Sequence, residues 1–108
     1  MTIAQVYTML TSITAFASKV VYWAWPEGKA PKLPFICFHT PDANTFGADN
    51  AVYYTANRFL IELYSKTKDT TSEGLVEAKL TSQSIFYTKS TNYLDDEKCY
   101  LTTYEIEV

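Results

Sequence analysis

The stretch that organises this chain runs from Asn50 to Asp69 and reads NAVYYTANRFLIELYSKTKD. Three of its apolar residues recur at a period of two, namely Phe59, Ile61 and Leu63. Successive side chains of a strand point to opposite faces, so these three share one face and Glu62 and Tyr64 lie on the other. A shift of one residue would carry Glu62 into the core, so strand register is tightly specified here. We therefore predict a central strand over Arg58 to Ser65.

A helix is predicted on each side of this strand. Thr2 and Gln5 form a capping box ahead of apolar residues at helical spacing, which are Ile3, Val6, Tyr7, Leu10, Ile13 and Ala17. Thr70 to Glu73 reads as a second capping box, opening a helix that runs to about Ser82. Its predicted buried face comprises Leu75, Val76 and Leu80, with Glu77 and Ala78 opposite and Lys79 within the stripe.

Further strands are predicted at Val20 to Trp25, Phe35 to His39, Ser84 to Ser90 and Lys98 to Val108. The order is α-β-β-β-α-β-β, which indicates one α+β domain over residues 1–108, with about five strands in a mainly antiparallel sheet. Both helices then cover one face, and the face with Glu62 and Tyr64 is left for solvent or another chain. Phe46 lies in a long loop of turn-forming residues and either folds back as an anchor or projects into a partner.

The aromatic content exceeds what a small core readily holds. The chain of 108 residues has nine Tyr, six Phe and two Trp. Tyr and Trp favour sites where one end is buried and the other is wet, and they are enriched in protein interfaces. This surplus indicates burial against a partner, although half-exposed strand faces in a monomer explain it as well.

Charge is divided unequally along the chain. The net charge is −3, which argues against general nucleic-acid binding, because affinity for phosphate comes mainly from Lys and Arg. Residues 1–68 hold six bases and four acids, whereas residues 69–108 hold three bases and eight acids. Copies with unlike halves can associate side by side with charge selecting their orientation, and a solvated acidic region is the simpler alternative.

No residue pattern indicates catalysis. His39 is the single histidine, and no nucleophile motif accompanies it, so a structural role at a strand end is favoured over a general base. A carboxylate pair between Glu62 and Glu105 is a weak enzyme hypothesis, because salt bridges explain the same residues. Asn92 to Glu97 is predicted to be an acidic turn, and its adjacent carboxylates, Asp95, Asp96 and Glu97, point in different directions. We therefore expect no enzyme activity, metal or cofactor.

The two cysteines and the ends of the chain carry no special signal. Cys37 and Cys99 lack zinc-site spacing and are expected to be small buried residues in a reducing cytosol, with a disulfide between strands as the alternative. No basic segment precedes an apolar run at the N-terminus, and no stretch reaches the roughly 18 apolar residues of a membrane span. A soluble, unprocessed product is expected.

Several short motifs of the chain together form a family-like pattern. They are Ala48-Asp49-Asn50, Val52-Tyr53-Tyr54, Ile61-Glu62-Leu63-Tyr64, Lys68-Asp69, Tyr100-Leu101 and Tyr104-Glu105-Ile106-Glu107, together with the Pro-Phe-Ile-Cys-Phe strand that begins at Pro34. With these motifs the chain resembles a family of small tail-completion proteins of long-tailed phages and prophages of Gram-positive bacteria, a family that is similar to tail terminators and head-to-tail joining proteins. These are structural signatures, and the family pattern has no active-site residues to carry over.

The resemblance implies an α+β subunit of a hexameric ring at the head-proximal end of the tail tube. Such a ring stops tube polymerisation, contacts the tail tube protein and the head connector protein, and resides in the host cytoplasm before assembly into the virion tail. The residues expected at its interfaces are Trp23, Trp25, Phe46, Asp49, Tyr53, Tyr54, Glu62 and Tyr64. No membrane contact or sequence-specific nucleic-acid binding is expected. A phage-encoded binding module that inhibits a host protein is the alternative function.

Overall fold

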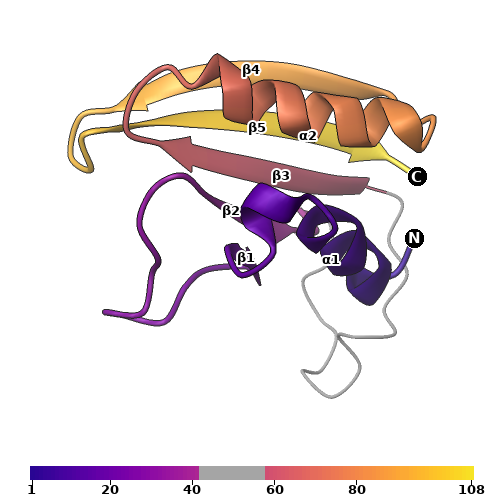
Figure 1. The fold of residues 1–108 in the computed structure, drawn as a ribbon, viewed down its shortest axis with the longest axis horizontal. Helices are drawn as coiled ribbons and strands as arrows, with labels where there is room; N and C mark the ends of the chain where they lie inside the picture. Colours follow the sequence, from indigo (N-terminus) through magenta and orange to yellow (C-terminus); the bar gives the residue numbers. More distant parts are fainter. Residues whose placement is uncertain (42–57) are drawn as a thin grey trace.

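The computed structural model describes residues 1–41 and 58–108, and a five-stranded sheet forms its framework (Figure 1). The strands are β1 (Val20–Tyr22), β2 (Phe35–His39), β3 (Arg58–Ser65), β4 (Tyr87–Leu94) and β5 (Cys99–Glu107). Their order across the sheet is β1-β2-β3-β5-β4. β1 pairs with β2 in parallel, and every other neighbouring pair is antiparallel. The predicted central strand therefore occupies the middle of a mainly antiparallel sheet.

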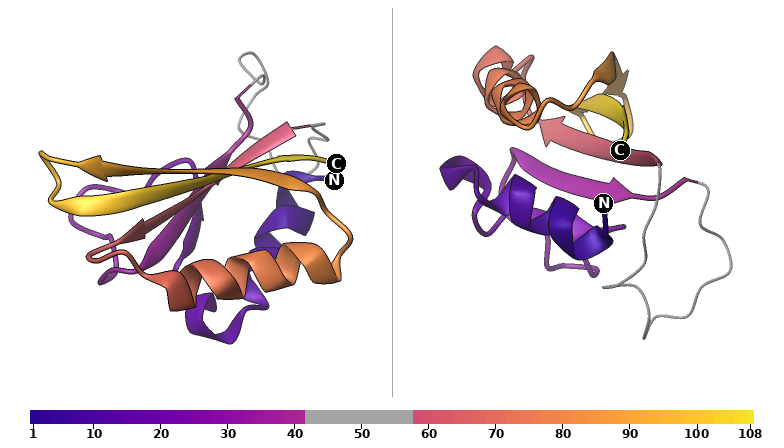
Figure 2. Two further views of the ribbon diagram at one scale, coloured as in Figure 1. Left: turned by 90° about the horizontal axis from the view of Figure 1, so that it is seen from above. Right: turned by 90° about the vertical axis from the view of Figure 1, so that its right-hand side faces the viewer.

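Two helices cover one face of this sheet (Figure 2). They are α1 (Ile3–Thr11), followed by a short 3-10 helix, η1 (Thr14–Phe16), and α2 (Thr70–Ser82). Helix α1 lies over the β1 and β2 side, and α2 lies over the β4 and β5 side. The predicted α+β class and the order α-β-β-β-α-β-β are confirmed.

The core lies between the helices and the apolar face of β3. Phe59, Ile61 and Leu63 are completely buried, in one cluster with apolar residues of both helices. The register continues this face onto the neighbouring strands, because Ile61 is opposite Phe38 on β2 and opposite Tyr104 on β5. The period-two pattern therefore sets the sidedness of the whole sheet.

The first helix is shorter than its apolar spacing predicts. Its capping box is present, with the Gln5 amide donating to Thr2 Oγ1 at 3.1 Å and the Thr2 amide donating to Gln5 Oε1 at 2.7 Å. The helix ends at Thr11, where the Thr11 hydroxyl donates to the Tyr7 carbonyl at 2.8 Å and the Ser12 hydroxyl donates to the Met9 carbonyl at 2.6 Å. Such hydroxyls compete with the helical hydrogen bonds. Tyr7, predicted on the buried face of this helix, is instead 44 % exposed, and Met9 is buried.

The bounds of two strands differ from the sequence interpretation. Strand β1 ends at Tyr22 because Trp23 adopts a left-handed backbone with φ of 72°, which an extended strand does not accommodate. The fourth strand is predicted over Ser84 to Ser90, but β4 runs from Tyr87 to Leu94, so the predicted turn from Asn92 to Glu97 begins only after Leu94. Ser84 also has a positive φ, of 57°, and makes the turn out of α2. Neither turn contains Gly, which is why sequence pattern alone misplaces them.

The start and the buried face of α2 also need correction. Asp69, not Thr70, is the N-cap, and its carboxylate accepts from the Ser72 amide at 2.9 Å and the Ser72 hydroxyl at 2.8 Å. Leu75 is 39 % exposed, while Ser72, Glu73, Val76 and Leu80 are buried. The predicted capping box and the placement of Leu75 in the buried stripe are therefore wrong.

The sidedness of β3 predicts unequal effects of two leucine truncations. Leu63→Ala should lower the free energy of unfolding by about 2–5 kcal/mol, because it removes methyl groups from a packed core and leaves a cavity. Leu60→Ala, on the opposite face of the same strand, is the matched control and should cost clearly less. Urea denaturation of both variants measures the difference, and equal losses would contradict the assigned faces.

Candidate functional site

The face of the sheet opposite the helices carries the side chains expected at interfaces. Strand β2 contributes Phe35, Cys37 and His39 to it, and β3 contributes Glu62 and Tyr64. The register places Phe35 opposite Tyr64 and Cys37 opposite Glu62. Within residues 1–41 and 58–108, no helix covers this face (Figure 2). We call these five residues, with Trp23 and Trp25, the open face.

Three aromatic rings form a row across the open face. The Trp25 and Phe35 centroids are 6.0 Å apart in an edge arrangement, and the Phe35 and Tyr64 centroids are 5.3 Å apart. All three side chains are half-buried. Among the residues that the structure describes, no hydrogen-bond partner faces the buried indole N–H of Trp25. The row therefore offers aromatic contact area, which Trp and Tyr supply at many protein interfaces.

A second aromatic contact lies beside this row. The rings of Trp23 and His39 stack, with centroids 4.5 Å apart and an interplanar angle of 22°. His39 Nδ1 is 3.8 Å from Glu62 Oε1, too far for a hydrogen bond, and within residues 1–41 and 58–108 this nitrogen has no hydrogen-bond partner. His39 thus has neither a nucleophile nor a tightly bound orienting group, which general-base catalysis requires. The stacking of Trp23 on His39 holds both rings in place as part of the open face.

Burial raises the pKa values of Cys37, Glu62 and Tyr64 on the open face. Burial and the charge of Glu62 raise the pKa of the Cys37 thiol to about 11. Burial likewise raises the pKa of the Tyr64 phenol to about 12, with Glu62 adding to the effect. Burial also raises the pKa of Glu62, which His39 partly opposes. At neutral pH the thiol and the phenol are therefore uncharged, and neither is activated as a nucleophile.

An ionic cluster joins α2 to β4 on the helix side of the sheet. Glu73 is almost fully buried and binds two lysines, Lys68 and Lys89, with Lys89 Nζ at 2.7 Å from Glu73 Oε1. Lys89 also donates to Glu77 Oε2 at 2.7 Å, and the Tyr104 hydroxyl donates to the same oxygen at 2.8 Å. Glu77 therefore faces the sheet, contrary to the predicted helix face.

This cluster keeps its acids and bases in their ordinary charged states. Burial alone would raise the pKa of Glu73, but hydrogen bonds from Lys68 and Lys89 outweigh it and lower the pKa. The hydrogen bond from Lys89 lowers the pKa of Glu77, and the same contacts raise the pKa of Lys89. None of Glu73, Glu77 and Lys89 has a pKa moved toward neutrality, as acid–base catalysis requires. The cluster serves to hold α2 on the sheet.

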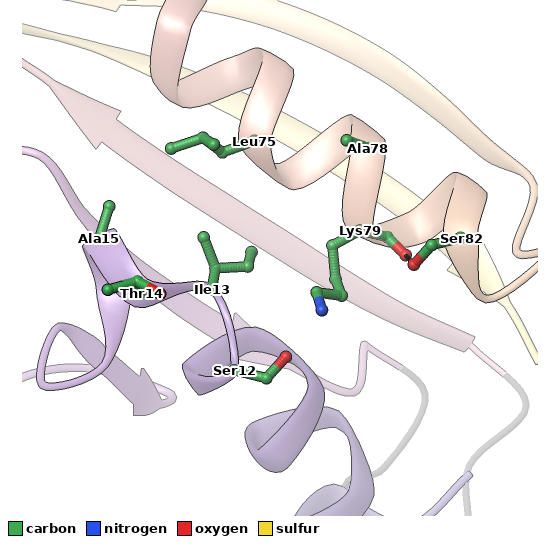
Figure 3. A pocket seen from close by; sticks show the side chains of 8 residues that line it. All are labelled: Ser12, Ile13, Thr14, Ala15, Leu75, Ala78, Lys79 and Ser82. Atoms are coloured by element: carbon green, nitrogen blue, oxygen red, sulfur yellow. Dashed lines mark hydrogen bonds between the residues drawn. The ribbon is translucent and has the colours of Figure 1, made fainter.

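A shallow groove separates the end of α1 from α2 (Figure 3). Its volume is about 660 Å³, and Ile13 lines one side while Leu75 and Ala78 line the other. The Lys79 side chain crosses from α2 toward Ser12, so it lies over the groove. No acidic residue of the described part of the chain lines the groove, so it contains no acid–base pair that could catalyse a reaction. It offers only a contact surface.

Of the eight residues predicted at interfaces, the structure brings four together on the open face: Trp23, Trp25, Glu62 and Tyr64. The other four, Phe46, Asp49, Tyr53 and Tyr54, lie outside the described residues. The sequence interpretation missed Phe35, because an unbroken apolar run predicts burial on both faces. Alternation with the fully buried Ile36 and Phe38 is the signal that separates Phe35 from the core.

Several further findings bear on chemistry. Both cysteines are free and buried. Within the described ranges, no group of three or more His, Cys, Asp or Glu side chains is placed to hold a metal ion. No helix of that part of the chain has the length and apolar character needed to cross a membrane. No protein-family model, curated protein or solved structure matches the chain.

The ionic cluster predicts how stability depends on pH. The folded state lowers the pKa of Glu73 below its ordinary value of 4.5, so its contribution is present above that pH and is lost as the pH falls through the folded value. Glu73→Gln should lower the free energy of unfolding at pH 7 by about 1–3 kcal/mol, because the two lysines lose a charged acceptor. The difference from wild type should shrink on acidification.

The matched control for this prediction is Glu107→Gln, which changes the same group at an exposed position on β5. It should leave stability within about 0.5 kcal/mol of wild type. Denaturant unfolding at several pH values between neutrality and strong acid measures both variants. A difference between Glu73→Gln and wild type that stays constant on acidification would contradict the assigned ionisation.

Proposed function

We propose that this chain is a structural assembly protein of a long-tailed phage, which ends the tail tube and joins the tail to the head as a subunit of a hexameric ring. Its partners are further copies of itself, the tail tube protein and the head connector protein. It resides in the host cytoplasm before assembly and in the virion tail afterwards. The proposal comes from the resemblance of the sequence to small tail-completion proteins, and the open face supports it.

The open face is the observation that carries most weight. It groups Trp25, Phe35 and Tyr64 in one row on a sheet whose other face is occupied by both helices. Half-buried aromatic side chains supply large contact area at low entropic cost, and they dominate binding energy where a partner excludes water. The neutral thiol and phenol nearby add no charge that association would have to desolvate. This surface suits a protein partner.

The test is capping of purified tail tubes of a long-tailed phage of Gram-positive bacteria. Tubes polymerised with the protein should be shorter, and electron microscopy should show added density at one end. Light scattering of the protein alone then reports whether copies associate before they meet a tube. A protein that leaves tube length unchanged and instead retains one host protein would fit the alternative function, an inhibitor of a host protein, and would overturn the assembly role.

The open face predicts which substitutions separate assembly from folding. Trp25→Ala should reduce tube capping by about tenfold or more, because an aromatic anchor at an interface is lost. Its melting temperature should stay close to that of wild type, since the side chain is only half-buried and lies away from the helix-side core.

The control is Tyr7→Ala, which removes an exposed aromatic side chain from α1 on the opposite side of the sheet. It should leave capping unchanged. Calorimetry reports folding and tube length reports capping for both variants. If Trp25→Ala proves unfolded at room temperature, the side chain is part of the core and its assignment to the interface is wrong.

A further inference from the structure

Strand β4 presents an unpaired edge along its full length. It has eight residues and pairs with β5 on one side, and it is the last strand in the sheet order. Among the described residues, no strand pairs with its other side. The backbone N–H and C=O groups on such an edge are a template for another strand.

This edge lacks the usual protection against strand addition. Natural edges are protected by proline, by bulges or by charged side chains, especially Lys. Strand β4 has no proline, and its single charged residue, Lys89, turns onto α2 to bind Glu73 and Glu77. The residues at its two ends add apolar surface, since Phe86 is 93 % exposed and Tyr93 is 48 % exposed. An added strand would cover both backbone and aromatic groups.

The two edges of the sheet differ in charge, and this difference indicates which strand would add to β4. Residues 69–108 form α2, β4 and β5 and carry eight acids and three lysines. Residues 1–41, which include α1, β1 and β2, carry Lys19, Lys29 and Lys32 against Glu27, and Lys19 directly precedes β1. Pairing β4 with β4 of a second copy would bring like charges together, whereas pairing it with the β1 edge joins unlike charges.

Strand direction then fixes how the two edges would meet. Strand β4 runs opposite to β5, which runs opposite to β3, which runs opposite to β2, and β2 is parallel to β1. Strand β4 therefore runs opposite to β1. In a sheet continued into a second copy with the helices on the same side, β4 meets β1 antiparallel. The acidic turn at residues 95–97, after β4, then lies beside Lys19, before β1.

We propose that β4 of one copy adds antiparallel to β1 of the next copy, so that identical subunits join head to tail with Asp95, Asp96 and Glu97 against Lys19. This contact rests on the proposed ring assembly and names the surfaces that form it. Within the described residues, neither the acidic turn nor Lys19 has an ion-pair partner. Head-to-tail contacts of this kind close into rings when the rotation between copies permits.

Site-directed cross-linking tests the contact. One variant carries Ser18→Cys, just before Lys19, and a second carries Glu97→Cys at the end of the acidic turn; both leave Lys19, Asp95 and Asp96 in place. The two full-length variants are mixed at low salt and treated with a short bifunctional maleimide. The mixture should give a cross-linked dimer at least about tenfold more abundant than either variant alone or wild type, whose two cysteines are buried.

The outcomes separate the possible contacts. Cross-linking of Glu97→Cys alone would show that the acidic turns of two copies meet each other and not Lys19, and it would overturn the proposal, as would the absence of any dimer. Tube capping without the cross-link would leave the proposed function in place and remove this contact. The cross-link without capping would keep this contact and remove the assembly role.

Charge reversal supplies an independent readout. Lys19→Glu and Asp96→Lys should each lower self-association at low salt by about three- to tenfold, and the two changes combined in one chain should restore it. Lys66→Glu is the matched control, because it makes the same charge change at the end of β3 in the middle of the sheet. Sedimentation at two salt concentrations measures these effects. Equal losses for Lys66→Glu and Lys19→Glu, or no recovery in the double variant, would overturn the contact.

Discussion

The register of β3 between β2 and β5 is the constraint on which the rest of this structure depends. It places Phe59, Ile61 and Leu63 beneath both helices and, by the same alternation, turns Glu62 and Tyr64 to the opposite face. Because the side-chain period is two, the core and the aromatic open face cannot be specified separately. Residues that place the core side chains beneath the helices therefore also place the aromatic side chains on the open face.

Helix α2 is held on the sheet by ion pairs as well as by buried apolar side chains. Its fully buried apolar residues are Val76 and Leu80, a narrow stripe for a helix of 13 residues. Glu73 lies buried on the same side and holds Lys89 of β4, so the helix is joined to the edge strand through charge. A buried carboxylate without partners would destabilise the fold, whereas this one binds two lysines. The cluster also removes the one charge that could protect the edge of β4.

Sequence reasoning recovered the fold where the pattern is periodic and failed where single contacts decide. The alternation in β3 is long enough to be unambiguous, and the capping box of α1 is a local hydrogen-bond pattern. The left-handed turn at Trp23 accompanies stacking of its ring on His39, a contact between residues 16 positions apart that no local pattern predicts. Glu73 was read as part of a capping box, because its lysine partners lie five and sixteen residues away. The open face was foreseen as a face, but its aromatic row needed the pairing of β2 with β3.

The same sheet leaves two kinds of surface, and they impose different demands on a partner. The open face offers side chains, so a partner is selected by the shape and polarity of its own side chains. The edge of β4 offers backbone groups, which accept any strand that approaches, so selection there depends on charge and direction. In the proposed contact, the acidic residues after β4 and the basic residue before β1 would supply that selection, because an identical copy approaching in the wrong orientation would meet like charges. A partner at the edge of β4 lies in the plane of the sheet, whereas a partner on the open face lies above or below that plane. A subunit joined to its copies along the edges therefore keeps its aromatic face available to a different protein.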